Sequence, residues 1–344
     1  MTDLSRIVAE MRASRGFAHK QDIGSVMRHL AGTPAAPGGT ANGDDCAVLP
    51  DPSGQGYLLF AIEGLVRDFV EVMPWFAGYS AVMVNLSDIA AMGGRPIAVV
   101  DALWSDGEDM AIALLAGMRA AAERYGVPLV GGHTNLHADA AQLAVSVIGR
   151  AQRLVQSFTA RPGDTLLMAV DLRGAWHDPY PFWDASTLAP AERLRSDMEL
   201  LPQLAEAGLI DAGKDISMAG LLGTLLMLIE CSQVGAVVDM ERIPRPNELP
   251  CEDTALLRWL TAFPSFGYLL SVRPEHVDEV MQRFLAAEIG CAAIGEVTLG
   301  SRLVLRDAGQ QAILWDHAQE PFITARNCHA SRPAYRPADT TEVP

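Results

Sequence analysis

The sequence lacks the patterns of metal–thiolate, disulfide-rich, membrane and nucleic-acid-binding proteins. Its five cysteines are scattered and show no C-x-x-C spacing, which argues against a zinc site or a disulfide framework and favours a reducing cytoplasm. Lys and Arg total 26 against 42 Asp and Glu, a formal charge of −16, so a basic nucleic-acid groove is not expected. The apolar run 218–229 is too short to span a bilayer, and the first 15 residues have no apolar signal core.

The composition is typical of a globular enzyme with two domains. The chain has 344 residues, of which 49% are apolar and 20% charged, and this length suffices for two cores of ordinary size. Strand and helix patterns alternate and restart after the segment 160–164, which contains a proline and a glycine. We therefore expect an N-terminal domain over 1–160, a C-terminal domain over 161–329 and a flexible tail over 330–344.

Hydrophobic periodicity predicts an α+β fold with mixed sheets in both halves. The expected helices are 77–92, 108–124, 190–201, 219–230 and 274–286. The expected strands are 46–49, 57–62, 97–104, 127–130, 141–149, 166–170, 236–239, 268–272 and 291–297.

Three acidic motifs stand beside small residues at distant points of the chain. Gly43, Asp44 and Asp45 precede an apolar strand. Asp88 lies inside an apolar helix, and Asp215 precedes another apolar run. A carboxylate in such surroundings is costly unless it is paired or binds a cation. If the fold brings these acids together, they form an all-oxygen site that suits Mg²⁺ on nucleotide phosphates.

Each motif also has a purely structural interpretation. The Asp44-Asp45 pair fits an Asx turn at the start of a strand. Asp88 fits a hydrogen bond between helices, and Asp215 fits a helix N-cap. The individual motifs are therefore weak, and their combination carries the functional interpretation.

Three further features accompany the acids. Gly131-Gly132-His133-Thr134 follows a buried strand, where paired glycines let backbone amides approach a phosphate and Thr134 can donate a hydrogen bond. The same segment also fits a tight strand-to-loop turn. Lys20 before a helical stretch and Glu63 at a strand end both fit ordinary solvated charges.

Together the motifs resemble those of a superfamily that includes aminoimidazole ribonucleotide synthetase, thiamine-monophosphate kinase, selenophosphate synthetase and the hydrogenase maturation protein that dehydrates a carbamoyl thioester. The resemblance covers residues 15–310. The segments similar to thiamine-monophosphate kinase are Gly43–Leu49 and Asn85–Gly93. The segments closer to selenophosphate synthetase are Met92–Pro96, Gly131–Thr134 and Asp215–Gly223.

The resemblance implies an N-terminal mixed sheet that forms a dimer interface and a C-terminal α/β domain packed against it. ATP would lie in a cleft built partly at that interface. The implied Mg²⁺ ligands are Asp44, Asp45, Glu63, Asp88 and Asp215. The implied nucleotide contacts are Gly43, Asp44, Asn85, Gly131, Gly132, His133 and Thr134. Lys20 is implied as catalytic with Asp45 and Asp88, because its ammonium could neutralise charge on a transferring phosphoryl group.

Four positions depart from the patterns of these relatives. Selenophosphate synthetase has a cysteine or selenocysteine where this chain has Phe17, which argues against selenide chemistry. Thiamine-monophosphate kinase has aspartates where this chain has Glu63, His133 and Met218. Glu63 can still coordinate a cation with a longer reach, whereas His133 and Met218 remove two acidic groups.

The sequence therefore predicts ATP- and Mg²⁺-dependent phosphoryl transfer to, or activation of, a small-molecule acceptor. Two alternatives stay open: a thiamine-monophosphate or selenophosphate synthetase-like kinase, and a non-catalytic nucleotide-binding protein. A cytoplasmic homodimer is expected, without a nucleic-acid or membrane partner. The segment Trp176–Trp183 concentrates aromatic and polar groups, so it fits either a loop over the acceptor or an insertion packed on the surface.

Overall fold

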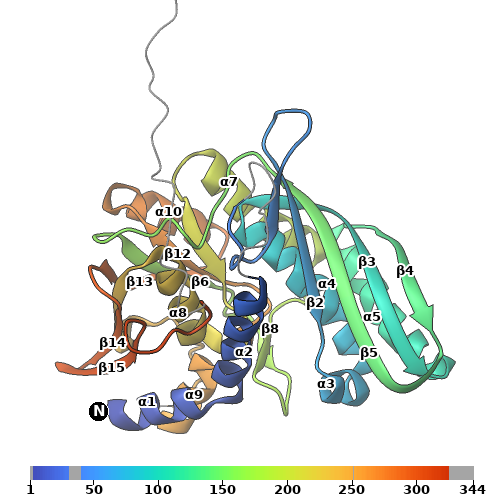
Figure 1. The fold of residues 1–344 in the computed structure, drawn as a ribbon, viewed down its shortest axis with the longest axis horizontal. Helices are drawn as coiled ribbons and strands as arrows, with labels where there is room; N and C mark the ends of the chain where they lie inside the picture. The colour runs from blue at the N-terminus through green and yellow to red at the C-terminus, as the bar shows by residue number, and fades with distance from the viewer. Residues whose placement is uncertain (1–2, 31–39, 251, 325–344) are drawn as a thin grey trace, which may run out of the picture.

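Two α+β halves pack side by side in the computed structural model, which describes residues 3–30, 40–250 and 252–324. Each half has its own sheet and its own buried helix (Figure 1). The predicted fold class is confirmed. Within the described residues, none of the helices combines the length and the apolar content needed to cross a membrane.

The N-terminal half is a five-stranded sheet covered on one face by two helices (Figure 1). In spatial order its strands are β1 (Ala47–Pro50), β2 (Tyr57–Gly64), β5 (His137–Ala151), β3 (Gly94–Asp106) and β4 (Leu129–Asn135). The helices are α4 (Pro74–Ala91) and α5 (Glu108–Tyr125), and the short α3 (Arg67–Val72) precedes them. α4 and α5 touch through backbone, because a Cβ at Gly117 would lie 1.9 Å from the Trp75 carbonyl oxygen.

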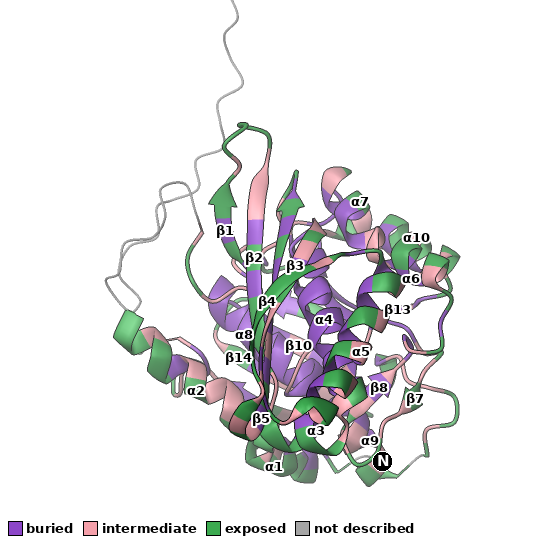
Figure 2. Ribbon diagram, turned by 90° about the vertical axis from the view of Figure 1, so that its right-hand side faces the viewer, coloured by how far each residue is buried: buried purple, intermediate pink, exposed green. Residues whose placement is uncertain are grey.

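The C-terminal half surrounds a helix with no exposed face. All residues of α8 (Gly220–Ser232) are buried, as is α4 from Phe76 onward (Figure 2). Its seven-stranded sheet runs β15 (Gln310–Asp316), β14 (Arg302–Asp307), β10 (Gly235–Asp239), β13 (Gly290–Thr298), β6 (Thr165–Val170), β12 (Gly267–Val272) and β9 (Ala212–Asp215). Its other helices are α6 (Ala191–Met198), α7 (Leu200–Glu206), α9 (Asp253–Leu260) and α10 (Val277–Ala286).

A small third sheet links the two halves. Its strands are β11 (Phe263–Pro264), β8 (Phe182–Asp184) and β7 (Ala175–Trp176), so residues of the predicted aromatic loop form a hairpin. The rings of this hairpin meet α3 and α4 of the N-terminal half: Phe182 lies 4.9 Å from Phe69, centroid to centroid. The hairpin therefore bridges the halves.

The first two helices belong to the C-terminal core. Leu4, Ile7 and Met11 of α1 (Leu4–Ala13) and Phe17 of α2 (Arg15–Leu30) share one buried cluster with α8. The division of the chain at residue 160 stays a prediction, and the predicted tail 330–344 lies outside the described residues.

Two local interpretations were wrong in detail, and one hairpin was not expected. Gly131–Thr134 does not end the strand, because β4 continues through Asn135. Asp215 is not an N-cap: it ends β9, and α8 begins at Gly220 after Ala219, whose φ is +87°. The β14–β15 hairpin was not among the expected strands.

Candidate functional site

Three of the predicted acids converge where the halves meet. Carboxylate oxygens of Asp45, Asp88 and Asp215 all lie within 4.8 Å of one another. Asp45 comes from the loop before β1, Asp88 from the last turn of α4, and Asp215 from the end of β9. The cluster therefore joins both halves and exists only in the folded chain.

The turn at Asp44 presents Asp45 to the cluster. Asp44 accepts hydrogen bonds from the Ser157 amide at 2.9 Å and the Ser157 hydroxyl at 2.6 Å, one on each carboxylate oxygen. It also accepts from the Asp45 amide at 3.1 Å, and Gly43 provides a positive φ of +123°. Asp44 thus holds the backbone, and the structure places it beside the three converging acids.

A buried lysine that sequence reasoning missed sits among these acids. Lys214 of β9 forms an ion pair with Asp45, and the side chains of both are only 5% exposed. Burial alone lowers the pKa of Lys214, but attraction to Asp45, Asp44 and Asp215 outweighs it and raises that pKa above its usual value. Lys214 is therefore an ammonium cation inside the protein.

The acids hold protons more tightly than ordinary carboxyl groups. Burial, reinforced by repulsion from Asp45, raises the pKa of Asp215 to about 8. Burial, with repulsion from Asp215 and Glu63, raises the pKa of Asp88 well above its usual range. Burial also raises the pKa of Asp44 to about 6 and that of Glu63, although Lys20 opposes the rise at Glu63. Lys214 alone does not balance the carboxylates of this site.

These residues fit a hard divalent cation. The donors are carboxylate oxygens from three chain segments, which is the ligand type that Mg²⁺ prefers. Their mutual spacing lets one ion reach several of them, and a cation would offset the repulsion that raises their pKa values.

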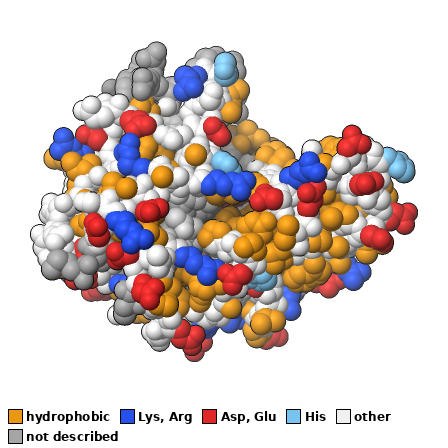
Figure 3. All heavy atoms as spheres, turned by 90° about the horizontal axis from the view of Figure 1, so that it is seen from below, with side chains coloured by type: hydrophobic (Ala, Val, Ile, Leu, Met, Phe, Trp, Pro, Cys, Tyr) orange, Lys and Arg blue, Asp and Glu red, His pale blue; other side chains and the backbone are white. Residues whose placement is uncertain are grey.

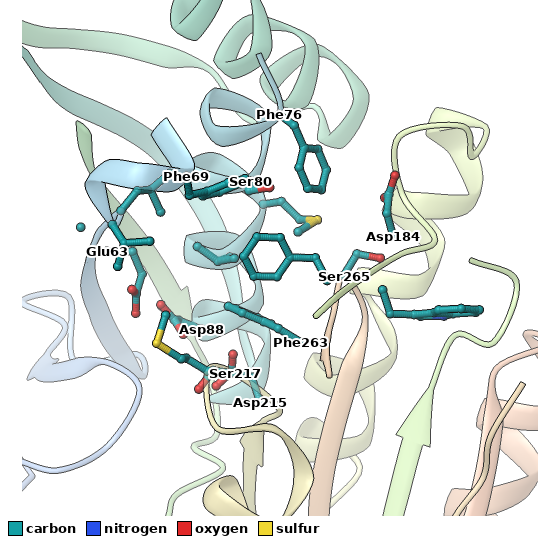
Figure 4. A pocket seen from close by; sticks show the side chains of 18 of the residues that line it. Glu63, Phe69, Phe76, Ser80, Asp88, Asp184, Asp215, Ser217, Phe263 and Ser265 are labelled. Atoms are coloured by element: carbon teal, nitrogen blue, oxygen red, sulfur yellow. The ribbon is translucent and has the colours of Figure 1, made fainter. Parts of the chain in front are cut away.

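A cavity adjoins the acids and holds the other predicted charges. The space between its lining atoms, including the part that opens to solvent, is about 780 Å³. Glu63, Asp88, Asp215 and Ser217 lie together at one end (Figure 4). Lys20 and Met218 also line the cavity, and Lys20 is near enough to Glu63 and Asp215 for its charge to oppose the rise that burial causes in the pKa of both. The aromatic rings of Phe76, Phe182 and Phe263 line the rest. Lys20 of α2 thus lines the same cavity as the acids, and its catalytic role stays a prediction.

Two other sets of predicted nucleotide contacts are not part of the acid cluster. Gly131-Gly132-His133-Thr134 is exposed on β4, at the opposite edge of the N-terminal sheet from β1 (Figure 1). One protomer therefore does not bring this segment to the acid cluster. Asn85 is fully buried in α4 and donates to the Ala81 carbonyl, while its side-chain oxygen has no partner among the described residues.

Without metal, stability should fall as the pH rises. Above about pH 4 the unfolded acids have released their protons, whereas the folded acids still hold theirs. For each such acid, the free energy of unfolding therefore falls by at most about 1.4 kcal/mol per pH unit, until the pH passes the pKa of that acid in the folded protein. In a chelator, the melting temperature should decrease from about pH 6 to about pH 8, and excess Mg²⁺ should oppose the decrease. Asp215→Asn should flatten the profile. A melting temperature that rises over this interval in the native protein would contradict the assignment.

Removal of the buried ammonium should destabilise the fold. Lys214→Met leaves Asp45 buried without its partner, so we expect the free energy of unfolding in chelator to fall by about 3–5 kcal/mol. Lys20→Met, at a partly exposed position, should change it by less than about 1 kcal/mol. The double variant Lys214→Met with Asp45→Asn should recover part of the loss, because it also removes the carboxylate that pairs directly with Lys214. Urea unfolding measures all three, and equal losses for both lysine variants would disprove this role.

Comparison with known proteins places the chain in a family. Residues 43–151 match the model of the N-terminal domain of AIR synthase related proteins, and residues 165–308 match the model of their C-terminal domain. An uncharacterized protein of Synechocystis sp. is 44% identical, over 93% of this chain and 98% of its own.

More distant relatives carry named activities. The thiamine-monophosphate kinase of Synechococcus elongatus is 28% identical, over 79% of this chain and 88% of its own. The selenide, water dikinase of Myxococcus xanthus is 26% identical, over 87% of this chain and 96% of its own.

Solved structures share the fold. AaThiL complexed with AMPPCP and TMP superposes with a TM-score of 0.64 at 20% identity, over 84% of this chain and 92% of that one. T. maritima PurL complexed with ATP superposes with a TM-score of 0.67 at 19% sequence identity. The match covers 87% of this chain and 49% of that one, so this chain spans about half of PurL. With both domain models matched in order, the chain belongs to the AIR synthase related family.

Proposed function

We propose that this protein transfers the γ-phosphoryl group of ATP to an oxygen of a small-molecule acceptor, with Mg²⁺ held by Asp45, Asp88 and Asp215. The convergence of these three carboxylates beside a cavity that also contains Lys20 is the observation that carries the proposal. Relatives bound to ATP or AMPPCP support the nucleotide. Bound Mg²⁺ would supply positive charge to the phosphates.

The chain's own residues would position the phosphates and neutralise their charge. The acceptor oxygen attacks the γ-phosphorus, the bond to the bridging oxygen breaks, and ADP leaves with that electron pair. Lys20 lies at the acid end of the cavity, where its ammonium can approach the transferring group. Glu63 lines the same end as a further ligand candidate. Lys214 is engaged by Asp45 and would keep that carboxylate in place.

Phe17 makes selenide chemistry a poor candidate. This side chain is fully buried and packs on Phe322 and Trp315, with ring centroids at 5.3 and 6.2 Å. It is absent from the cavity lining. A thiamine-monophosphate kinase activity is the second candidate, because a relative with that name matches 79% of this chain and a structure with the same fold is AaThiL complexed with AMPPCP and TMP. Met218, which stands in place of an acid, contacts His19 at 3.4 Å and weakens that case.

A homodimer would complete the site. The sheet face opposite α4 and α5 carries exposed Phe60 and Ile62 of β2, and Phe60 pairs directly with exposed Ile148 of β5. An apolar sheet face of this kind suits a second copy of the chain. The exposed Gly131–Thr134 segment could then reach the nucleotide of the partner, consistent with its position far from the acids of its own chain.

Nucleotide turnover should depend on Asp88. We expect Asp88→Asn to lower ADP formation at least about 100-fold, because a neutral amide is a poor Mg²⁺ ligand and no longer fixes the phosphates. The measurement is ADP release with ATP, Mg²⁺ and a metabolite mixture, with thiamine monophosphate tested separately. Asp239→Asn, on β10, is the control and should retain activity. A wild type that binds ATP·Mg²⁺ but forms no ADP with any acceptor would favour the non-catalytic alternative.

Mixed dimers should recover activity if Gly131 acts on the partner's nucleotide. A Cβ at Gly131 meets no atom within 4 Å, so Gly131→Asp should fold normally while its charge repels phosphate. Gly131→Asp and Asp88→Asn homodimers should each be inactive. After subunit exchange, half of the dimers are mixed and each has one intact site, so about a quarter of wild-type activity should return. No recovery, with mixed dimers verified by mass, would place both residues in the same site.

A further inference from the structure

The cavity has a second end whose chemistry differs from that of the acid cluster. Phe69 of α3, Phe76 of α4, and Phe182 and Trp183 of β8 line the cavity there, and Phe263 of β11 lies between them and the acids (Figure 4). None of these rings takes part in the proposed phosphoryl transfer. From this end we infer the class of the acceptor, an inference that rests on the proposed function for the role of the bound molecule.

We propose that the aromatic end binds a flat, uncharged aromatic or heteroaromatic ring of the acceptor, whose oxygen-bearing arm extends to the acids. Aromatic side chains favour such rings, because edge-to-face and offset contacts add to the apolar area that is buried. Seen from below, hydrophobic side chains gather across the middle of the molecule, on the side where α3 and the β7–β8 hairpin lie (Figure 3).

One face of α4 sets the length of the acceptor. Phe76, Ser80, Val84 and Asp88 all line the cavity and are four residues apart, so they follow one face of the helix. At 1.5 Å per residue, Asp88 lies about 12 Å along the axis from Ser80 and about 18 Å from Phe76. A ring near Ser80 therefore needs an arm of about 10 Å to place an oxygen at the acids.

The ring site is already formed in the free protein. His177 stacks on Phe76 with centroids 3.7 Å apart and planes 7° apart, and its Nε2 lies 3.2 Å from Asp184. The ring centroid of Phe182 lies 4.9 Å from that of Phe69 and 6.1 Å from that of Phe263. These contacts fix the hairpin against α3 and α4, so a ligand need not order it.

The polar groups at this end indicate what kind of ring fits. Asp184 already accepts hydrogen bonds from the Ser186 and Thr187 amides at 2.8 and 3.0 Å. Ser80 is 6% exposed, and no described residue hydrogen-bonds its hydroxyl. Ser265 lies opposite the acids, near Asp184 (Figure 4).

These few polar side chains suit an acceptor ring with one or two polar atoms better than they suit the adenine of ATP. Two serine hydroxyls can satisfy one or two polar atoms of a ring, whereas adenine would leave several unpaired in an apolar site. Among the described residues that line this end none is a cation, which disfavours a ring bearing a carboxylate or phosphate.

A matched pair of probes tests the inference on the full chain. Binding of 3-phenyl-1-propanol and of its saturated counterpart 3-cyclohexyl-1-propanol is measured by ligand-observed NMR, with and without AMPPCP and Mg²⁺. We expect the aromatic alcohol to bind about three- to ten-fold more tightly, and Phe182→Ala to remove most of that preference. Phe182→Leu, which keeps the volume, should also lose it, while Leu188→Ala, at a 96% exposed position, should not.

The outcomes separate this inference from the proposed function. Equal binding of the two alcohols, or an unchanged preference in both folded Phe182 variants, overturns the aromatic site. Displacement of the aromatic alcohol by AMPPCP·Mg²⁺ also overturns it, because the ring site would then belong to adenine. Simultaneous binding supports it. If the aromatic alcohol binds but AMPPCP does not, the ring site stands and the proposed phosphoryl transfer fails.

Discussion

The attraction between Lys214 and Asp45 is the interaction on which the site depends. Four buried or nearly buried carboxylates meet where two domains touch, and one internal ammonium offsets part of their repulsion. The raised pKa values show that the offset is incomplete. The protein therefore folds with an excess of acidic groups that protons or a divalent cation can neutralise, and this excess is the physical basis of the proposed Mg²⁺ site.

The placement of the cluster couples domain packing to ligand binding. Asp215 enters from the C-terminal sheet, whereas Asp45 and Asp88 belong to the N-terminal half. The aromatic hairpin crosses the same boundary and packs against α3 and α4. A molecule that spans the cavity would touch both domains at both ends, so binding and interdomain order are expected to reinforce each other.

Much of the fold and the acid cluster could be predicted from the sequence, for identifiable reasons. Asp88 stood out because a carboxylate within an apolar helix needs a partner, and long periodic segments such as α4 and α5 were located closely. Their convergence was predictable only through the family resemblance, since Asp45 and Asp215 are 170 residues apart. Which rings of the segment Trp176–Trp183 face a cavity, and that Phe69 and Phe263 join them, depends on tertiary packing that periodicity does not encode.

Lys214 was not predicted as a site residue, although the composition of the chain contains a signal for it. Of the 26 basic residues, 24 are arginines, and the only two lysines are Lys20 and Lys214. Arginine serves the surface ion pairs of the described residues, while Lys20 lines the cavity and Lys214 pairs with Asp45 in the adjoining acid cluster. Lysine-directed chemistry is thereby confined to this place. Lys20 is half-buried and the Lys214 side chain is only 5% exposed, so the reactivity of the two amines reports how tightly this interface is packed.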